Sequence, residues 1–434
     1  MSTATPDVVV IGAGPAGCTT ALAHARLGHR VLLLEAERKP PARLAGEWLH
    51  PQGVEVLRRL DVHVPTARPA QGFVLHPEDG GPPITLACPR GGRATTAHHR
   101  DLVTHLRDTA AGHPAITLVL GARATAVDHA TVTYTQNGGP ERSVPVERVV
   151  GSDGQASLVR RALRLAPAPA LTVSRTAGLL LRGADLPTEG YGHVFAGGPG
   201  PALAYRVDDD TVRLTIDVPL RSPRSAQLLS YLKHAYLPVL PARLAAALRR
   251  ALEDRAVQWA ANRVRTRTFH GRGPYALIGD AAGTCHPLTA SGLTIALRDA
   301  ECLAGTHDVT GHGRRRQAAV RAHEHLAAAM HRLLSDSGHP TAALRASMYA
   351  ILRTSAFERE RMMRVLCAEE HRTLALGGAV LHVAAHALRG HLGGGPTRPP
   401  WRSTARTCGE YLDWLRWMSR VRHIPAHPPE TADR

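Results

Sequence analysis

The order of apolar and polar positions near the start of the chain predicts a strand, a turn, a helix and a second strand. Residues 7–11 (DVVVI) form a short β-branched run, which is typical of a buried parallel strand. A glycine-rich turn follows, then a helical pattern over residues 15–27 that ends at Gly28, and an apolar run over residues 30–34 that leads into Glu35. Alternating strands and helices of this length predict the α/β fold class.

The turn between the first strand and the helix carries the spacing G-x-G-x-x-G. Gly12 permits the tight turn, Gly14 lets the backbone approach a pyrophosphate, and Gly17 lets the helix pack closely on the strand. Glu35 follows Gly17 by 35 − 17 = 18 residues, close to the spacing of about 20 expected for an acid that binds ribose hydroxyls. The motif alone leaves NAD and FAD open. The expected dinucleotide contacts are Gly12, Gly14, Pro15, Ala16, Gly17, Glu35 and Ala36.

Two later segments also have the pattern of a strand, a short turn and a helix. Residues 149–161 contain Asp153-Gly154 before a helix that we expect to start near Ser157. Residues 275–304 contain Gly279-Asp280, a loop of small residues, and a helix expected to start near Gly292. With the first motif, and in this order, these segments resemble the FAD-dependent monooxygenases of the para-hydroxybenzoate hydroxylase fold.

This resemblance implies a place for each motif around FAD. Asp280 would bind the ribityl chain, and the backbone N–H groups of residues 291–294 would face the flavin pyrimidine edge, where a helix N-terminus favours negative charge. The family's flavin-side arginine corresponds to Arg100, for which a solvated helix start is the alternative. The other implied cofactor contacts are Arg43, Asp153, Gly279, Pro287, Gly292, Leu293 and Thr294.

Several stretches resemble the squalene epoxidase family in particular. They are residues 43–53 (RLAGEWLHPQG), 286–289 (HPLT) with 292–294 (GLT), 193–198, 201–205, 212–219, 236–241 and 376–378. The resemblance implies that the catalytic positions are His286, Pro287 and Ser291, beside the reacting face of the flavin. His286 is either a structural hydrogen-bonding residue or a tuner of the flavin and its peroxide.

The sequence departs from that family in features that concern the membrane and the substrate. It lacks the N-terminal membrane segment and the long apolar C-terminal anchor, and it has Ala290-Ser291-Gly292 where the family has three glycines. No clear counterpart of the family's active-site tyrosine precedes Arg100. We therefore expect a cytoplasmic protein, leave a peripheral membrane contact open, and do not expect squalene itself to be the required substrate.

The pattern along the chain predicts three units. A Rossmann-like FAD-binding domain is discontinuous and comprises residues 1–164 and 262–310. A mixed-sheet substrate domain comprises residues 66–98 and 165–261, and a C-terminal helical region covers residues 311–434.

Within the substrate domain we expect an apolar sheet face. The expected strands are 178–181, 202–207 and 211–218, with a hairpin turn at 208–210. Alternation places Val212, Leu214 and Ile216 on one face, which we expect to line an apolar cavity over the flavin, with plain sheet packing as the alternative. The helices expected beyond the sheet are 317–334, 341–363 and 374–388.

Composition narrows the choice of partners. Aromatic residues make up only 4% of the chain, which argues against a base-stacking nucleic-acid platform. The formal charge of 53 − 36 = +17 is spread along the chain, so a basic face could steer an acidic partner or an anionic membrane. The six cysteines include no C-x-x-C pair, which suits reduced thiols. The histidine pairs at 323/325 and 382/386 lack a third ligand, so no metal is expected.

The expected activity follows from the cofactor. Reduced FAD and O2 would form a flavin C4a-hydroperoxide that epoxidises an alkene of an apolar, isoprenoid or polyene-like substrate. Electrons would come from NADPH or NADH, directly or through a flavoprotein or ferredoxin reductase. The alternatives are an aromatic or quinone-ring hydroxylase and a prenyl reductase. A flavin halogenase is disfavoured because neither Lys39 nor Lys233 is well placed, and a flavin-binding protein without activity is the last alternative.

Overall fold

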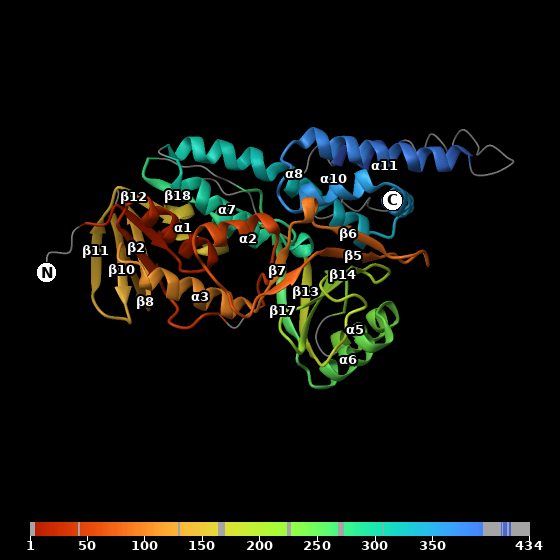
Figure 1. Cartoon of the computed structure of the whole chain (residues 1–434), viewed down its shortest axis with the longest axis horizontal. Coiled ribbons are helices and arrows are strands. Elements are labelled where there is room, and N and C mark those ends of the chain that lie inside the picture. Colours follow the sequence, from red (N-terminus) through yellow and green to blue (C-terminus); the bar gives the residue numbers. More distant parts are fainter. Residues whose placement is uncertain are drawn as a thin grey trace, which may run out of the picture.

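The protein is described here by a computed structural model. It describes residues 5–41, 44–128, 131–163, 170–223, 227–267, 273–306, 308–393, 409, 411–414, 416 and 417. Figure 1 shows two sheet-based parts side by side, with helices from the last third of the chain along the top.

The first part is built on a parallel sheet of five strands. The first strand of the chain lies in the middle of this sheet, and later strands add on both sides of it. In order across the sheet they are β18 (Tyr275–Leu277), β12 (Arg148–Gly151), β1 (Val8–Ile11), β2 (Val31–Glu35) and β8 (Ile116–Leu120). The carboxyl ends of β1, β2 and β12 therefore meet at a switch point, where open α/β sheets bind their ligands.

Helices cover one face of this sheet and a small antiparallel sheet covers the other. The helices are α1 (Pro15–Arg26), α2 (Pro51–Arg59), α3 (His99–Gly112) and α7 (Gly292–Ala304). On the other face lie β9 (Ala122–Asp128), β10 (Thr131–Gln136), β11 (Glu141–Pro145) and α4 (Leu158–Ala162). Both faces of the strands are thus buried, which explains why these strands read as continuous apolar runs.

The second part is built on a mixed sheet of seven strands. In order they are β17 (Gln258–Val264), β13 (Leu171–Arg182), β16 (Thr211–Pro219), β15 (Ala202–Arg206), β14 (Gly192–Phe195), β5 (Gly72–His76) and β6 (Ile84–Ala87). Only the β14–β5 pair is parallel. A small sheet of β3 (Trp48–Leu49), β7 (Ala94–Thr96) and β4 (Arg68–Ala70) lies between the two parts of the chain.

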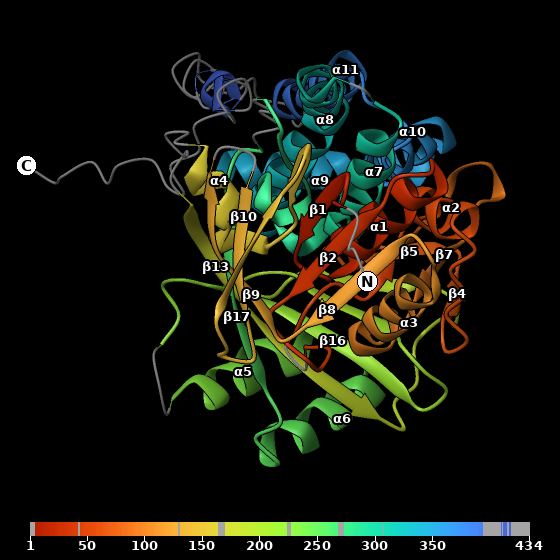
Figure 2. The same ribbon diagram turned by 90° about the vertical axis from the view of Figure 1, so that its left-hand side faces the viewer.

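The prediction that the apolar face of β16 lines a cavity over the flavin is wrong. Val212, Leu214 and Ile216 do share a face, but they pack into a cluster with α5 (Leu228–Tyr236) and α6 (Ala242–Glu253), which lie below the sheet in Figures 1 and 2. These two helices fill the space that a cavity would need. The opposite face of β16, which carries Arg213 and Asp217, is the one that faces the rest of the molecule.

The last third of the chain is helical, as expected, although one boundary differs. The helices are α8 (Val309–Ser335), α9 (His339–Thr354), α10 (Ala356–Leu366) and α11 (Thr373–Gly393). The single helix predicted over residues 341–363 is two helices, because Ser355 ends α9 and caps α10 by accepting a hydrogen bond from the Glu358 N–H. In the described parts of the chain, no helix is both long and apolar enough to cross a membrane.

The sheets and helices confirm the predicted fold class of an α/β part, a mixed-sheet part and a helical region. The exact domain boundaries stay a prediction.

Candidate active site

The glycine turn after β1 has the shape that a pyrophosphate requires. Gly12 has a φ of +101°, and a Cβ on Gly17 would lie 1.8 Å from the Gly12 carbonyl oxygen, so α1 lies against the turn. A Cβ on Gly14 would meet no protein atom within 4 Å. The N-terminus of α1 has no side-chain cap, and Pro15 and Ala16 begin its first turn. An anion therefore fits in front of this helix end.

Glu35 lies at the end of β2, beside the same turn. Its Oε2 accepts the Ala13 N–H at 2.7 Å and pairs with Arg107 Nη2 at 3.1 Å. Arg107 also donates from Nε to the Ala13 carbonyl oxygen at 3.0 Å. Ala36 follows directly and is half-buried. The carboxylate is thus fixed beside the glycine turn.

Arg107 is a site residue that the sequence analysis missed. It is buried on the inner face of α3, in line with Val103 and Ala110. An arginine at a position that helical spacing assigns to the core was the available signal. The expected Arg100 is exposed in the first turn of the same helix, and the expected Arg43 lies outside the described residues.

The Gly279-Asp280 turn is fixed by packing and by a buried acid. Gly279 has a φ of +56°, and its Cβ position lies 3.2 Å from the Ala16 Cβ of α1. Asp280 is exposed beside this contact. The Gly279 N–H donates to Asp299 Oδ2 at 3.1 Å, and Asp299 is fully buried in α7.

Asp299 was also missed by the sequence analysis. Its carboxylate pairs with Arg316 Nε at 2.8 Å and with Arg267. An acid one helical turn after Ile295, on the apolar face of the helix, was the available signal. Through these contacts one buried carboxylate ties α7, α8 and the Gly279-Asp280 turn together.

The Asp153 carboxylate accepts a hydrogen bond from the backbone of its own segment. Its Oδ2 accepts the Leu158 N–H at 2.6 Å at the start of α4, which begins one residue after Ser157. The neighbouring Ser152 hydroxyl contacts the Gly12 carbonyl oxygen at 2.8 Å. The Asp153 segment therefore supports the glycine turn from behind.

The loop of residues 285–291, which we call the α7 entry loop, leads into α7. It contains a 3-10 turn at Pro287–Thr289 and then Ala290, whose φ of +50° lies in the left-handed region. Gly292 is exposed and starts α7, whose N-terminus has no side-chain cap. The backbone N–H groups in the first turn of α7 can therefore bind an acceptor such as the flavin pyrimidine edge.

The expected catalytic residues lie on different sides of this loop. Pro287 is exposed on the loop surface, whereas His286 and Ser291 are buried behind it, with exposures of 3% and 1%. The Ser291 hydroxyl contacts Thr289 Oγ1 at 2.9 Å and also His323 of α8. Protein atoms therefore surround both polar side chains.

The expected contacts Leu293 and Thr294 follow in the first turn of α7. Leu293 lies against the segment before β3, where a Cβ on Gly46 would be 3.6 Å from its Cβ. Thr294 is fully buried, and its Oγ1 accepts the His50 N–H at 2.9 Å. The hydroxyl of Thr294 thus holds α2 on α7.

A buried ion pair joins the start of the small sheet to the polar face of β16, opposite the face of Leu214. Glu47 and Arg213 are paired through two hydrogen bonds of 2.8 and 2.7 Å. Although burial raises the pKa of Glu47, its hydrogen bonds to Arg213 and His98 lower it overall. The nearby Glu47 carboxylate and the Asp208 carboxylate, which lies 2.8 Å from His98 Nε2, raise the pKa of His98 to about 9. The sheet face toward the α7 entry loop is therefore polar and charged.

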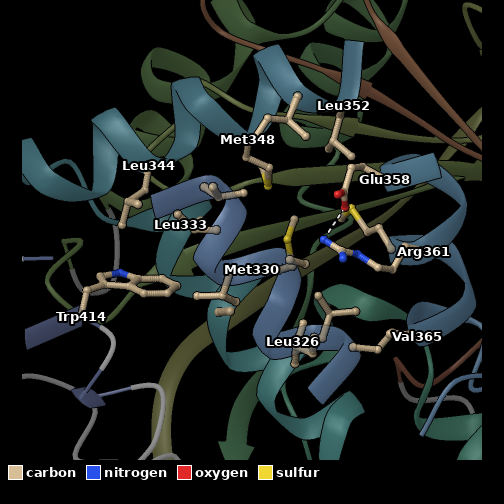
Figure 3. A pocket seen from close by; sticks show the side chains of 18 residues that line it. Leu326, Met330, Leu333, Leu344, Met348, Leu352, Glu358, Arg361, Val365 and Trp414 are labelled. Carbon is tan, nitrogen blue, oxygen red and sulfur yellow. Dashed lines mark ion pairs between the residues drawn. The ribbon is translucent and has the colours of Figure 1, made fainter. Parts of the chain in front are cut away.

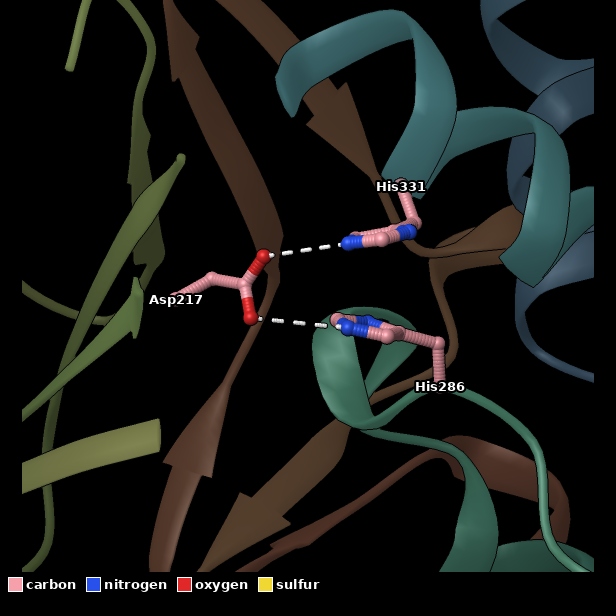
Figure 4. Close-up of side chains that lie close together, drawn as sticks. All are labelled: Asp217, His286 and His331. Atoms are coloured by element: carbon pink, nitrogen blue, oxygen red, sulfur yellow. Dashed lines mark ion pairs between the residues drawn. The ribbon is translucent and has the colours of Figure 1, made fainter. Parts of the chain in front are cut away.

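Three potential metal ligands lie together behind the α7 entry loop. Figure 4 shows the rings of His286 and His331 stacked, 4.0 Å between centroids, each facing one oxygen of Asp217. The distances are 3.5 Å from His286 Nε2 to Oδ1 and 3.3 Å from His331 Nε2 to Oδ2. Burial raises the pKa of Asp217, but the two histidines hold it far below its usual range. The cluster was not expected from the sequence.

An apolar cavity lies among α8, α9, α10 and α11. It is partly open to solvent and is surrounded by leucine, methionine and valine side chains and by Trp414 (Figure 3). Its polar edge is the Glu358–Arg361 ion pair, with an O–N distance of 2.5 Å. His382 Nδ1 lies 2.9 Å from the other oxygen of Glu358. The carboxylate is thus fully engaged by neighbours.

The parallel sheet, the glycine turn and the fixed acid define a dinucleotide-binding domain. A family model described as FAD dependent oxidoreductase matches residues 7–55. The chain belongs to the squalene epoxidase family, whose model matches residues 147–397. FAD as cofactor and the resemblance to this family are both confirmed.

Two relatives show the extent of the similarity. A squalene epoxidase of Aspergillus fumigatus is 31% identical over 316 residues, which are 68% of this chain and 64% of that protein. A squalene epoxidase of Candida albicans is 29% identical over 360 residues, 70% of this chain and 72% of that protein. The chain therefore spans less than two thirds of the Aspergillus protein.

The fold is shared with solved monooxygenases of other specificity. The structure of p-nitrophenol 4-monooxygenase from Pseudomonas putida matches with a TM-score of 0.69 at 19% identity, over 85% of this chain and 99% of that chain. At this identity the match shows the fold alone.

Proposed function

We propose that the chain is an FAD-dependent monooxygenase that epoxidises an alkene of an apolar, isoprenoid or polyene-like substrate with O2. The glycine turn of residues 12–17 and Glu35 would hold the FAD, which would supply the oxygen-transfer chemistry when bound and reduced. Family membership supports the flavin chemistry. The observation that carries the substrate class is the apolar cavity of the helical region.

The lining of this cavity favours a flexible hydrocarbon. Methionine side chains adapt to irregular apolar shapes, and Met330, Met348 and Met362 all line the space. The Glu358 carboxylate is already satisfied by Arg361 and His382, so no unpaired charge is left to bind an ionic substrate.

The cavity and the α7 entry loop share one hydrophobic cluster. Leu288 and Ala290 of the loop pack against the cluster that contains Leu326, Met330 and Leu333 of the cavity wall. Helix α8 thus presents one face to the cavity and another, with His323, to the loop. This arrangement supports a substrate chain that extends from the cavity toward the loop.

Electrons would reach the flavin from NADPH or NADH, directly or through a flavoprotein or ferredoxin reductase. A formal charge of +17 supports steering of an acidic reductase. A peripheral membrane contact is supported by the exposed side chains of Phe357, Leu374 and Leu381 on α10 and α11. No nucleic-acid partner is proposed.

Product analysis tests the proposal. The FAD-loaded protein is incubated with NADPH, with and without a generic reductase, and with a panel of terpenes, polyenes and phenols, in air and without oxygen. We expect an oxygen-dependent epoxide from an apolar alkene. A hydroxylated ring would instead indicate the aromatic or quinone-ring hydroxylase, and a saturated product formed without oxygen would indicate the prenyl reductase.

A matched pair of variants tests the cavity. Ala379→Phe adds a ring to the cavity wall, whereas Ala245→Phe adds the same ring on α6, far from the cavity. We expect Ala379→Phe to raise KM by about tenfold, equivalent to the loss of about 1.4 kcal/mol of binding, with little change for Ala245→Phe. Equal KM values for both variants and the parent protein would contradict the assignment of the cavity.

A further inference from the structure

Three buried imidazoles lie in or against the α7 entry loop, and they come from three places in the chain. His50 lies before α2, His286 belongs to the loop and His323 lies in α8; their exposures are 0%, 3% and 2%. Burial lowers the pKa of His50 and of His323 to about 4, and burial also lowers the pKa of His286. All three rings are therefore neutral near neutral pH, so each has one donor and one acceptor nitrogen.

The partners of His50 decide its tautomer. Its Nε2 lies 3.0 Å from the Thr289 carbonyl oxygen, which can only accept, so Nε2 carries the proton. Its Nδ1 lies 3.6 Å from Cys367 Sγ and accepts from that thiol. The ring thus uses its donor to hold the backbone of the loop.

The partners of His323 decide the opposite tautomer. Its Nδ1 lies 3.0 Å from the Val365 carbonyl oxygen, so Nδ1 carries the proton. Its Nε2 then accepts from the Ser291 hydroxyl, with Thr289 Oγ1 at 3.3 Å. The Ser291 proton is occupied in this bond, so Ser291 ties the start of α7 to α8.

His286 is fixed from both sides. Its Nδ1 accepts the Leu288 N–H at 3.3 Å, so Nε2 carries the proton and faces Ser174 Oγ at 3.0 Å. The Ser174 hydroxyl in turn donates to Asp217 Oδ1 at 2.5 Å, and Asn262 donates to the same oxygen at 3.0 Å. A metal on Nε2 would require the proton on Nδ1, opposite the Leu288 N–H, so this cluster is a hydrogen-bond network rather than a metal site.

We propose that His50, His286 and His323 are positioning residues that hold the α7 entry loop in one shape, each as a neutral imidazole of fixed tautomer. The inference rests on the proposed function for the position of the flavin at the N-terminus of α7. Both nitrogens of each ring are used within the protein. The imidazoles therefore act on the flavin through the loop backbone and not as bases toward the substrate.

The tautomers are measured first, by nitrogen-15 NMR of histidine-labelled protein with and without FAD, assigned with single histidine variants. We expect protons on Nε2 of His50 and His286 and on Nδ1 of His323, with all three rings neutral near neutral pH. An imidazolium at any of the three, or the other tautomer, overturns the proposal. The FAD-free sample gives this answer even if the proposed flavin chemistry is wrong.

A matched pair of variants then tests positioning. In His50→Gln the amide nitrogen can occupy the place of Nε2 and keep the bond to Thr289, whereas His50→Leu removes it. We expect His50→Leu to weaken FAD binding by about tenfold or more and to shift the flavin midpoint potential, because the Thr289 carbonyl loses its partner. His50→Gln should retain both values.

The control is His193→Leu, which removes a buried imidazole of the large sheet that bonds the Thr188 carbonyl oxygen at 2.8 Å. It should lower thermal stability without moving the flavin potential. A His50→Leu protein with an unchanged potential and unchanged FAD affinity overturns the positioning role. Failure of the parent protein to bind FAD at all would instead overturn the proposed function.

Discussion

The two ends of the proposed FAD site are built in different ways. At the pyrophosphate end, six consecutive residues form the turn and Glu35 is held by the backbone of that turn. At the flavin end, the α7 entry loop depends on the side chain of His50, directly before α2, and on side chains of β13, β16 and α8, with a backbone carbonyl of α10 as a further partner. The turn of the first end is formed by consecutive residues with distant support from Arg107 and Ser152, whereas the loop of the second end is held by side chains from several distant elements.

This difference has a physical consequence for substitutions. The shape of the glycine turn is set by its own backbone, and distant residues such as Arg107 and Ser152 only support that backbone. A loop held by a network of buried hydrogen bonds fails when any member loses its partner, since an unsatisfied buried group is costly. Substitutions at several distant positions should therefore disturb the flavin end, whereas the pyrophosphate end should be most sensitive to changes in its own turn.

The largest effect is expected from Gly17→Ala. Its Cβ would lie 1.8 Å from the Gly12 carbonyl oxygen, so either the helix or the turn must move. We expect a loss of about 3 kcal/mol or more of the free energy of unfolding, together with loss of FAD binding. Chemical denaturation and FAD titration measure the two values.

Gly14→Ala is the matched control, because its Cβ meets no protein atom within 4 Å. The free energy of unfolding should change by less than about 0.5 kcal/mol, whereas FAD affinity should fall because the new methyl group faces the cofactor. Equal stability losses in both variants would contradict the local character of this end.

Acid should weaken the flavin end. Burial lowers the pKa of His50 and of His323 to about 4 in the fold, from an ordinary value of 6.5. Above a pH of about 6.5, the pKa of histidine in the unfolded chain, the contribution of these neutral rings to the free energy of unfolding is complete. This contribution is lost as the pH falls toward 4. Between about pH 7 and about pH 5 we expect a loss on the order of 1 kcal/mol for each. Denaturant unfolding across this range measures it.

His98 has the opposite effect on the pH dependence of stability, and a His50 variant separates its contribution from that of the buried histidines. Its pKa is raised to about 9, so its contribution is complete below about pH 6.5 and is lost as pH rises through 9. In His50→Gln one buried imidazole no longer titrates, so the loss toward acid should be smaller than in the parent protein. An identical pH dependence would contradict neutral burial of His50.

The smallest effect is expected from Ala290→Gly. Ala290 has a φ of +50°, where glycine avoids the strain of a side chain, so stability should rise by up to about 1 kcal/mol. Ala296→Gly, in the middle of α7, is the control and should lower it by about 1 kcal/mol. A thermal shift of the same sign in both would contradict strain in the loop.

The sequence was sufficient where a feature depends on neighbours in the chain. The turn at Gly12, the start of α7 at Gly292 and the long C-terminal helices all follow from local periodicity and turn residues. The break at Ser355 also had a local signal, since Ser355 and Glu358 have the S-x-x-E spacing of a capping box.

Features that depend on distant partners were not predictable. Alternation separates the two faces of β16, but it does not say that α5 and α6 cover the face of Leu214. The pairing of His50 with Thr289 joins positions 239 residues apart, and that of Arg107 with Ala13 joins positions 94 apart. Only the tertiary fold brings such groups together.

The central claim is that this chain inserts one atom of O2 into an apolar alkene with FAD as its cofactor. The most direct measurement is mass spectrometry of the product formed by the FAD-loaded protein under oxygen-18 gas. The account predicts an epoxide that carries one labelled oxygen atom and that forms only when the flavin is reduced. A product without the label, or a protein that retains no FAD after desalting, would contradict it.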